Sequence, residues 1–221
     1  CLHEGARSST TFRRFVAAIA SDRSVYAPDA PGHGASDGPA SPPDLAGHVA
    51  AIGDLLDALR LRSIDVLGYG FGAAVAIELA LSRPSGVRRV ALFDVPDGSE
   101  PAPELGVFSE DGGHLATAWI RERARRGGQE LLEAAQAGYA EALALGERAT
   151  WAWAALSGWK GAERLAGLRQ PTLLCEPGHP GPSMTLRRGI TVLDGRRYAA
   201  DLFMAESTHL AAAIAGFLDD V

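Results

Sequence analysis

The sequence predicts an α/β fold in which helices flank a mostly parallel, twisted sheet. Short apolar runs at 64–67, 90–95, 171–175 and 190–193 alternate with longer stretches of helical pattern, as in βαβ units. A glycine-rich turn at 68–72 joins one of these runs to a helix-forming stretch. With 221 residues, 47% of them hydrophobic, the chain is long enough for one sizeable core.

The residues before this turn predict a helix, a strand, a loop and a second helix. Apolar residues at helical spacing predict a helix over 10–20, and the stretch 23–28 is expected to form a buried strand. A glycine-punctuated loop over 29–38 follows. Ser41, as an N-cap ahead of two prolines and Asp44, predicts the start of the second helix.

The residues after the turn predict a sheet that is interrupted by helices. A helix over 73–81 leads to a strand that ends near Val95, and strands over 171–175 and 190–193 precede a closing helix over 208–218. Only helical patterns fit 115–126, 130–145 and 150–159. We therefore expect a core made of 1–96 and 168–221, with a helical lid over 97–167.

The predicted lid contains every tryptophan of the chain, namely Trp119, Trp151, Trp153 and Trp159. If these rings face a pocket, they favour an apolar or aromatic ligand. The alternative is that they fill the lid's own core.

The turn itself is built like a nucleophile elbow, G-x-S-x-G, between strand and helix. In such an elbow the outer glycines let the helix pack closely behind the strand, and the central residue takes a strained, usually positive-φ conformation. Gly68 and Gly72 hold the outer positions here, and Gly70 holds the centre. Because glycine adopts positive φ without a steric cost, we expect the turn to be kept while the nucleophilic hydroxyl is absent.

Composition gives limits on partners and location. A net charge of -6 gives no electrostatic argument for nucleic acid or an anionic membrane, and no apolar run is long enough to span a bilayer. Two cysteines and no visible signal peptide predict a cytoplasmic protein. Cys1 and the residue after it look like a strand end, so further N-terminal residues are expected. No cofactor or metal is predicted, and a homo-oligomer is left open.

Four stretches together resemble the α/β-hydrolase superfamily over essentially the whole chain. They are the elbow, His3-Glu4-Gly5, the D-x-P-G-H-G-x-S-D loop at 29–37 and the stretch 110–115. The resemblance implies the fold, and it implies a catalytic serine, histidine and acid on loops at strand ends. Gly70 stands in place of the serine, and Tyr198 stands where the histidine is expected. Glu176 comes too early for the acid, and Asp94 is an alternative position for it. The triad is therefore predicted to be degenerate.

The resemblance also implies that the oxyanion hole is kept although the catalytic triad is not. The backbone N–H groups of Phe71 and of the loop at Gly5 and Ala6 should converge above Gly70. The groups predicted to transfer protons or to line the pocket around it are Glu4, His114, Tyr198, Tyr69, Asp94 and Trp119.

Three functions remain open from the sequence. The first is a non-hydrolytic enzyme, of lyase, cyclase or isomerase type, that acts on a small apolar or aromatic carbonyl compound. The second is a ligand-binding or scaffolding protein without turnover. The third is a hydrolase whose catalytic groups have moved, with Glu4 or His114 activating water.

Overall fold

A parallel sheet forms the centre of the computed structural model, which describes residues 1–99, 110–126, 132–175, 189–193 and 207–220. Its strands are β1 (Ile64–Tyr69), β2 (Val87–Phe93), β3 (Thr172–Cys175) and β4 (Ile190–Leu193), in the spatial order β1-β2-β3-β4. Every pairing between them is parallel, as the sequence predicted. Leu2 adds a parallel bridge to Gly68 at the outer edge of β1. The carboxyl ends of β1, β2 and β3 therefore lie along one edge of the sheet.

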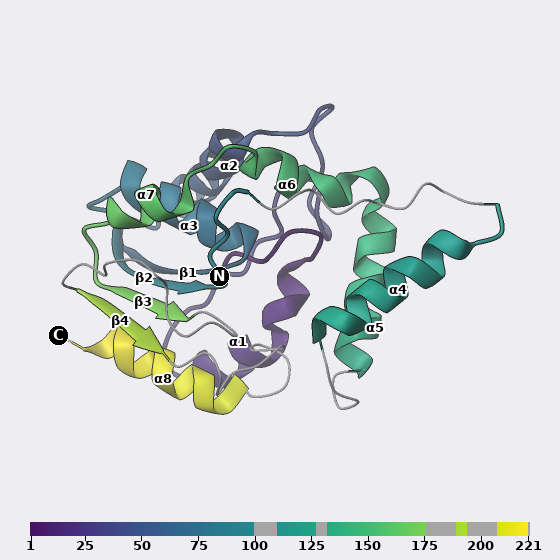
Figure 1. Cartoon of the computed structure of the whole chain (residues 1–221). Coiled ribbons are helices and arrows are strands. Elements are labelled where there is room, and N and C mark those ends of the chain that lie inside the picture. Colours follow the sequence, from purple (N-terminus) through teal and green to yellow (C-terminus); the bar gives the residue numbers. More distant parts are fainter. Residues whose placement is uncertain (100–109, 127–131, 176–188, 194–206, 221) are drawn as a thin grey trace.

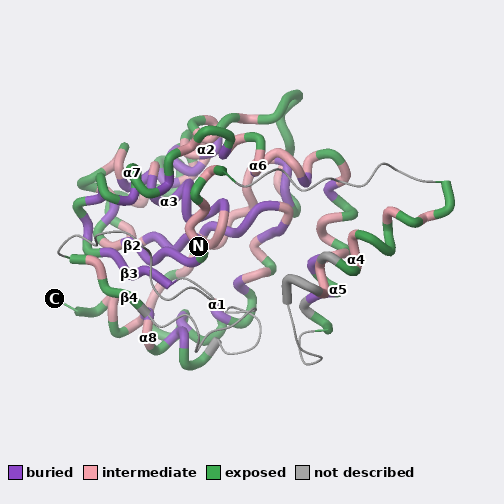
Figure 2. Tube along the Cα trace, viewed as in Figure 1, coloured by how far each residue is buried: buried purple, intermediate pink, exposed green. Residues whose placement is uncertain are grey.

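Helices cover both faces of this sheet (Figure 1). On one face lie α1 (Arg13–Ile19), preceded by the 3-10 turn η1 (Ser9–Phe12), and α8 (Ser207–Asp219). On the other lie α2 (Leu45–Ala58) and α3 (Phe71–Ser82). The strands serve both layers because successive side chains alternate: Val90 and Leu92 pack toward α3, whereas Ala91 and Phe93 pack toward α1 and α8. Helix α3 is buried along most of its length (Figure 2).

Between β2 and β3 the described chain is helical. It forms α4 (Gly113–Arg126), α5 (Leu132–Leu145), the 3-10 turn η3 (Gly146–Thr150), α6 (Trp151–Leu156) and α7 (Gly161–Ala166). Helices α6 and α7 pack on α3, while α4 and α5 pair with each other and project to one side (Figure 1). Trp153 and Trp159 join the main core cluster, and Trp159 Nε1 donates a hydrogen bond to Glu78 Oε1 at 2.8 Å. Those two rings thus contribute to the core under α6 and α7.

Three expected boundaries were wrong. The stretch 23–28 is not a strand; a backbone hydrogen bond of 2.7 Å joins Cys1 N to Tyr26 O, but no ladder of repeated pairs forms there. Strand β2 ends at Phe93 rather than near Val95, because Asp94 turns into the left-handed region at φ 52°. Helix α2 is capped by Asp44, whose carboxylate accepts from Gly47 N at 2.7 Å, so Ser41 lies outside it.

Candidate functional site

The turn after β1 has the backbone conformation of an elbow, with Gly70 at φ 55° and ψ −120°. Gly70 N donates to Phe93 O at 2.9 Å, and Gly70 O accepts from Ala73 N at 2.9 Å. These two bonds tie the turn to β2 and to the first turn of α3. A positive φ is costly for most L-residues and free for glycine, so the sequence accounts for this conformation.

The outer glycines of the turn permit a close approach between α3 and the chain around Leu2. A Cβ on Gly72 would overlap the carbonyl oxygen of Leu2, and a Cβ on Gly68 would overlap the backbone of Gly72. Helix α3 can therefore start directly behind β1. Phe71 is the first residue of that helix, so its N–H is one of those for which an α-helix offers no acceptor.

Glu4 lies directly beside the turn. A Cβ built on Gly70 would lie 2.9 Å from Glu4 Cβ and 3.5 Å from Glu4 Cα. Glu4 is only 4% exposed, and its carboxylate Oε1 is 3.3 Å from Arg7 Nε. Position 70 is thus bordered by the backbone and Cβ of a residue whose carboxylate is buried and paired with Arg7.

The loop after Glu4 is held tightly from the side of α6. A Cβ on Gly5 would lie 2.8 Å from Ala152 Cβ and 3.4 Å from the Trp153 ring. Ala6, the next residue, takes a left-handed φ of 56°, which is unusual for a residue other than glycine. The structure therefore brings Glu4 beside the turn, packs Gly5 against α6 and holds Ala6 in a strained conformation.

Polar contacts link the same loop to α4 and α5. Arg7 Nη2 donates to Glu122 Oε1 on α4. Ser8 Oγ donates to Glu141 Oε1 on α5 at 2.8 Å, and Thr10 Oγ1 donates to the same oxygen. Sequence analysis did not select Arg7, Glu122 or Glu141; the spacing of Glu4 and Arg7 was a local clue, but their partners lie more than 100 residues away.

Three buried histidines lie behind the turn and were also not selected. His3 Nδ1 lies 2.8 Å from Glu4 O, and its Nε2 accepts from Ala30 N at 2.9 Å, which fixes a neutral ring. Its ring centroid is 5.5 Å from that of His33. His48, on α2, packs edge-on against the Phe71 ring at 4.8 Å. Burial lowers the pKa of His3 and of His48 to about 4, and it lowers the pKa of His33 as well.

The loop 29–38 has a structural role around Asp29. Its carboxylate accepts from Ser9 N at 2.6 Å and from Ala35 N at 2.8 Å. Burial works to raise the pKa of Asp29, but these amide hydrogen bonds outweigh it and the pKa is lowered. The loop is thereby fastened to the residues that follow Arg7.

Other predicted site residues lie apart from this group. The Tyr69 ring packs against the core cluster under α1 and α8, and Asp94 is exposed after β2. Trp119 stacks edge-on with Tyr139 at 5.6 Å and lies three residues before Glu122, on the same face of α4. His114 is half-buried near the start of α4, about 12 Å along the helix axis from Glu122. Tyr198 lies outside the described residues.

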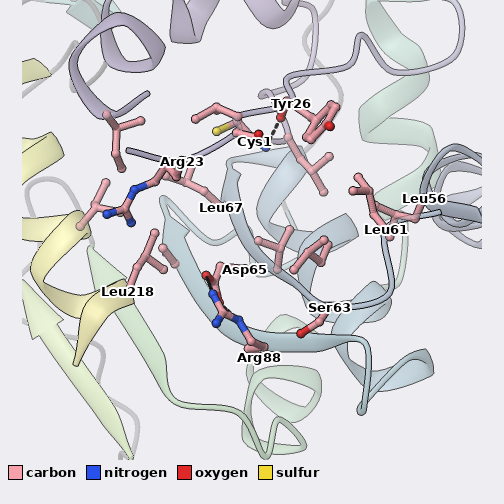
Figure 3. Close-up of a pocket in the computed structure, with 18 of the residues that line it drawn as sticks. Cys1, Arg23, Tyr26, Leu56, Leu61, Ser63, Asp65, Leu67, Arg88 and Leu218 are labelled. Carbon is pink, nitrogen blue, oxygen red and sulfur yellow. Dashed lines mark hydrogen bonds and ion pairs between the residues drawn. The ribbon is translucent and has the colours of Figure 1, made fainter. Parts of the chain in front are cut away.

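A cavity among the described residues lies elsewhere, along the outer edge of β1. It measures about 480 Å³, and its lining combines leucine and isoleucine side chains from α1, α2, β1 and α8 with charged side chains such as Arg23, Asp65 and Arg88. Figure 3 shows Arg23 and Leu218 on the left of it, Leu56 and Leu61 on the right, and the ion pair between Arg88 and Asp65 at the bottom. Neither Glu4 nor Gly70 lines it, so this cavity is separate from the elbow.

Comparison with known proteins now identifies the family. Residues 1–215 match the sequence model of the group described as the alpha/beta hydrolase family. The chain belongs to the alpha/beta hydrolase family. Its members share the fold described above, so the predicted fold class and the resemblance to this superfamily are both confirmed.

Curated relatives of this hydrolase-family chain match over part of its length. A 2-hydroxymuconate semialdehyde hydrolase from Pseudomonas sp. (strain CF600) is 33% identical over 104 residues, which are 45% of this chain and 36% of that protein. An uncharacterized protein from Mycobacterium bovis is 33% identical over 91 residues, 41% of this chain and 27% of that one. The matched stretches span about a quarter to a third of these relatives.

Solved structures match the hydrolase-family chain over nearly its whole length. An esterase from Rhodococcus sp. ECU1013 has a TM-score of 0.78 at 21% identity and covers 99% of this chain and 89% of its own. A meta-cleavage product hydrolase from Pseudomonas fluorescens IP01 has a TM-score of 0.74 at 18% identity, with coverage of 99% and 89%. At these identities the likeness shows the fold.

Two further observations concern the described part of the chain alone. None of its helices combines the length and the apolar character needed to cross a membrane. None of its His, Cys, Asp and Glu side chains gather in a group of three or more that could hold a metal ion.

Proposed function

We propose that this member of the alpha/beta hydrolase family binds a small apolar or aromatic carbonyl compound above Gly70 and moves a proton on it without a serine nucleophile. The observation that carries the proposal is the position of Glu4, whose Cβ is 2.9 Å from the point where a side chain at position 70 would begin. The backbone and Cβ of an acidic residue thus lie directly beside the turn. Glycine at position 70 offers no nucleophilic side chain at this point.

The proposed reaction uses Glu4 as the base and backbone N–H groups as hydrogen-bond donors to the substrate oxygen. The carboxylate takes a proton from the carbon next to a ketone. The C–H electron pair then forms a C=C bond, and the carbonyl π pair moves to oxygen. The N–H of Phe71 and the loop at Gly5 and Ala6 stabilise the resulting enolate oxygen. Return of the proton to another carbon gives isomerisation, and loss of a group from the β carbon gives a lyase reaction. His114 and Tyr198 are proposed as proton donors, and Trp119 as a wall of the pocket.

The relatives support the carbonyl class of ligand. One curated relative is named for a semialdehyde, and a structural neighbour is named for meta-cleavage products. The proposal includes a small molecule as the partner. It also includes a cytoplasmic location, which the composition predicts.

The test is the exchange of α-protons in D₂O, followed by proton NMR with phenylacetone as the probe. We expect exchange catalysed by the protein above the buffer rate, and we expect Glu4→Gln to lower it by about 100-fold. Exchange that is the same for Glu4→Gln and the unmodified protein would exclude Glu4 as the base. A fluorophosphonate probe should leave no covalent label, and p-nitrophenyl esters should not turn over; strong labelling would favour a hydrolase whose catalytic groups have moved.

A binding function without turnover is the second candidate. It is favoured by the buried ion pair of Glu4 with Arg7, which occupies the carboxylate. In that case phenylacetone binds, as measured by ligand-observed NMR, but its α-protons exchange no faster than in buffer.

A further inference from the structure

We infer that Arg7 is a positioning residue, which couples the docking of α4 and α5 to the orientation of Glu4 beside Gly70. The inference rests on the proposed role of Glu4 in proton transfer. In this inference α4 and α5 also orient the proposed base, besides covering a ligand. They confine the guanidinium of Arg7, and Arg7 in turn pairs with Glu4.

The first observation is that one buried guanidinium serves two carboxylates. The side chain of Arg7 is 6% exposed, and those of Glu4 and Glu122 are 5% and 12% exposed. Nε of Arg7 lies 3.3 Å from Glu4 Oε1, and Nη2 donates to Glu122 Oε1. Guanidinium donors lie in one rigid plane, so the orientation fixed by Glu122 decides which edge is presented to Glu4.

The second observation is that α5 lies flat against the same group. A Cβ on Gly138 would overlap the guanidinium of Arg7. Only a glycine at this point of α5 lets the helix approach so closely, although glycine weakens the interior of a helix. Gly138 on one side and Glu122 on the other therefore confine the Arg7 plane.

The third observation is that polar contacts join α4 and α5 to the loop around Arg7. Helix α4 packs on α5, and α5 packs on η3. Glu141 of α5 accepts from Ser8 and Thr10, one turn of chain beyond Arg7. If the two helices move away, Arg7 loses Glu122, and its Nη2 becomes available to Glu4. The Glu4 carboxylate then forms a bidentate pair with Arg7 and changes its orientation.

The test is a substitution that displaces the guanidinium without removing its charge. Gly138→Ala places a methyl group in the Arg7 plane. Gly216→Ala is the matched control, because Gly216 is also a helical glycine, on α8, and nothing lies within 4 Å of the Cβ it would gain. Both variants are compared with the unmodified protein by kcat and KM for α-proton exchange of phenylacetone. Hydrogen–deuterium exchange of the backbone amides is measured alongside.

We expect Gly138→Ala to lower kcat by about tenfold or more while KM changes by less than about twofold, because a small misplacement of the reacting group affects the chemical step. Amides of residues 5–10 and of α4 should exchange faster together in this variant, and Gly216→Ala should change neither quantity. Unchanged kcat and unchanged amide exchange in Gly138→Ala would overturn the inference.

A second pair of variants covers the case in which Gly138→Ala does not fold. Glu122→Gln keeps the shape of the Arg7 partner and removes its charge, whereas Glu163→Gln removes a charge from an exposed pair on α7. The inference requires the first to lower kcat and to loosen residues 5–10, and the second to do neither. If Glu4→Gln leaves exchange unchanged, the proposed function fails, and the amide exchange of Glu122→Gln still decides whether Arg7 couples the helices to the loop.

Discussion

Glu4 and Gly70 are neighbours across the elbow, and the side chain of one occupies the space that a side chain on the other would need. A Cβ on Gly70 would come within 2.9 Å of Glu4 Cβ, closer than such atoms approach in proteins without a shift. The absence of a side chain at position 70 and the presence of one at position 4 are thus complementary. Restoring a nucleophile would require the loop of Glu4 to move.

This complementarity predicts the outcome of Gly70→Ser. The serine would meet Glu4 Cβ, so we expect a loss of about 1–3 kcal/mol in the free energy of unfolding, measured by urea denaturation. We also expect no esterase activity, because the sequence predicts Tyr198 at the position of the family's histidine. The double variant Glu4→Gly with Gly70→Ser should recover part of the stability, because it removes the contacting Cβ. Esterase activity in the single variant would show that another residue serves as the histidine.

The buried histidines predict a loss of stability in mild acid. Burial lowers the pKa of His3 and of His48 to about 4, below the usual value near 6.5 in the unfolded chain. Below pH 6.5 the unfolded chain therefore binds protons that the folded protein does not. Stability is fully present above pH 6.5 and falls as pH drops toward 4, by up to about 3 kcal/mol for each of these two groups. Urea denaturation at pH 7.5, 6, 5 and 4 measures the decline.

His48 allows that prediction to be tested at one position. Neither of its ring nitrogens has a hydrogen-bond partner among the described residues, so replacing it breaks no recorded bond. We expect His48→Leu to leave stability at pH 7.5 unchanged or raised by about 1 kcal/mol. The same variant should show a shallower decline toward pH 4. An equal decline in both proteins would mean that His48 is protonated in the folded state.

The approach of α3 to Leu2 predicts that Gly72 tolerates no side chain. Gly72→Ala would place a methyl group on the carbonyl oxygen of Leu2, which is backbone and cannot turn aside. We expect a loss of about 3 kcal/mol or more in the free energy of unfolding. Gly216→Ala, in open space, should stabilise the protein slightly, by up to about 1 kcal/mol. Similar stabilities of the two variants would contradict the close packing of the elbow.

The attachment of α7 to α3 depends on Glu78. Its carboxylate accepts from Trp159 Nε1 at 2.8 Å and from Arg164 Nε at 2.7 Å. We expect Glu78→Ala to cost about 1–2 kcal/mol and to shift the tryptophan emission to longer wavelength. Arg164→Met should cost less, under about 1 kcal/mol, because the arginine side chain is 46% exposed. A larger effect of the arginine variant would show that the ion pair outweighs the indole hydrogen bond.

The sequence alone predicted the parallel sheet, the elbow and most helices, because each depends on short-range features. Apolar runs gave β1, β3 and β4 nearly at their observed limits, and the glycine spacing gave the positive φ of Gly70. The start of α2 was predicted wrongly at Ser41, because serine and aspartate are both common N-cap residues and only the carboxylate of Asp44 reaches a free backbone amide of the first turn. The strand expected over 23–28 failed because a strand needs a paired neighbour along its length.

The surroundings of Glu4 were decided by the tertiary structure. Sequence reasoning selected Glu4 from its place in a motif. Its ion pair with Arg7 is local, but the residues that confine Arg7 lie on α4 and α5, more than 100 residues further along the chain. Likewise His3, His33 and His48 are ordinary polar residues in the sequence and become buried only when the loop, α2 and the elbow pack together. The sequence determined which turn would form, because the backbone conformation of a turn depends on local residues. The tertiary structure decided which charges surround the turn, because burial and ion pairing depend on residues far apart in the sequence.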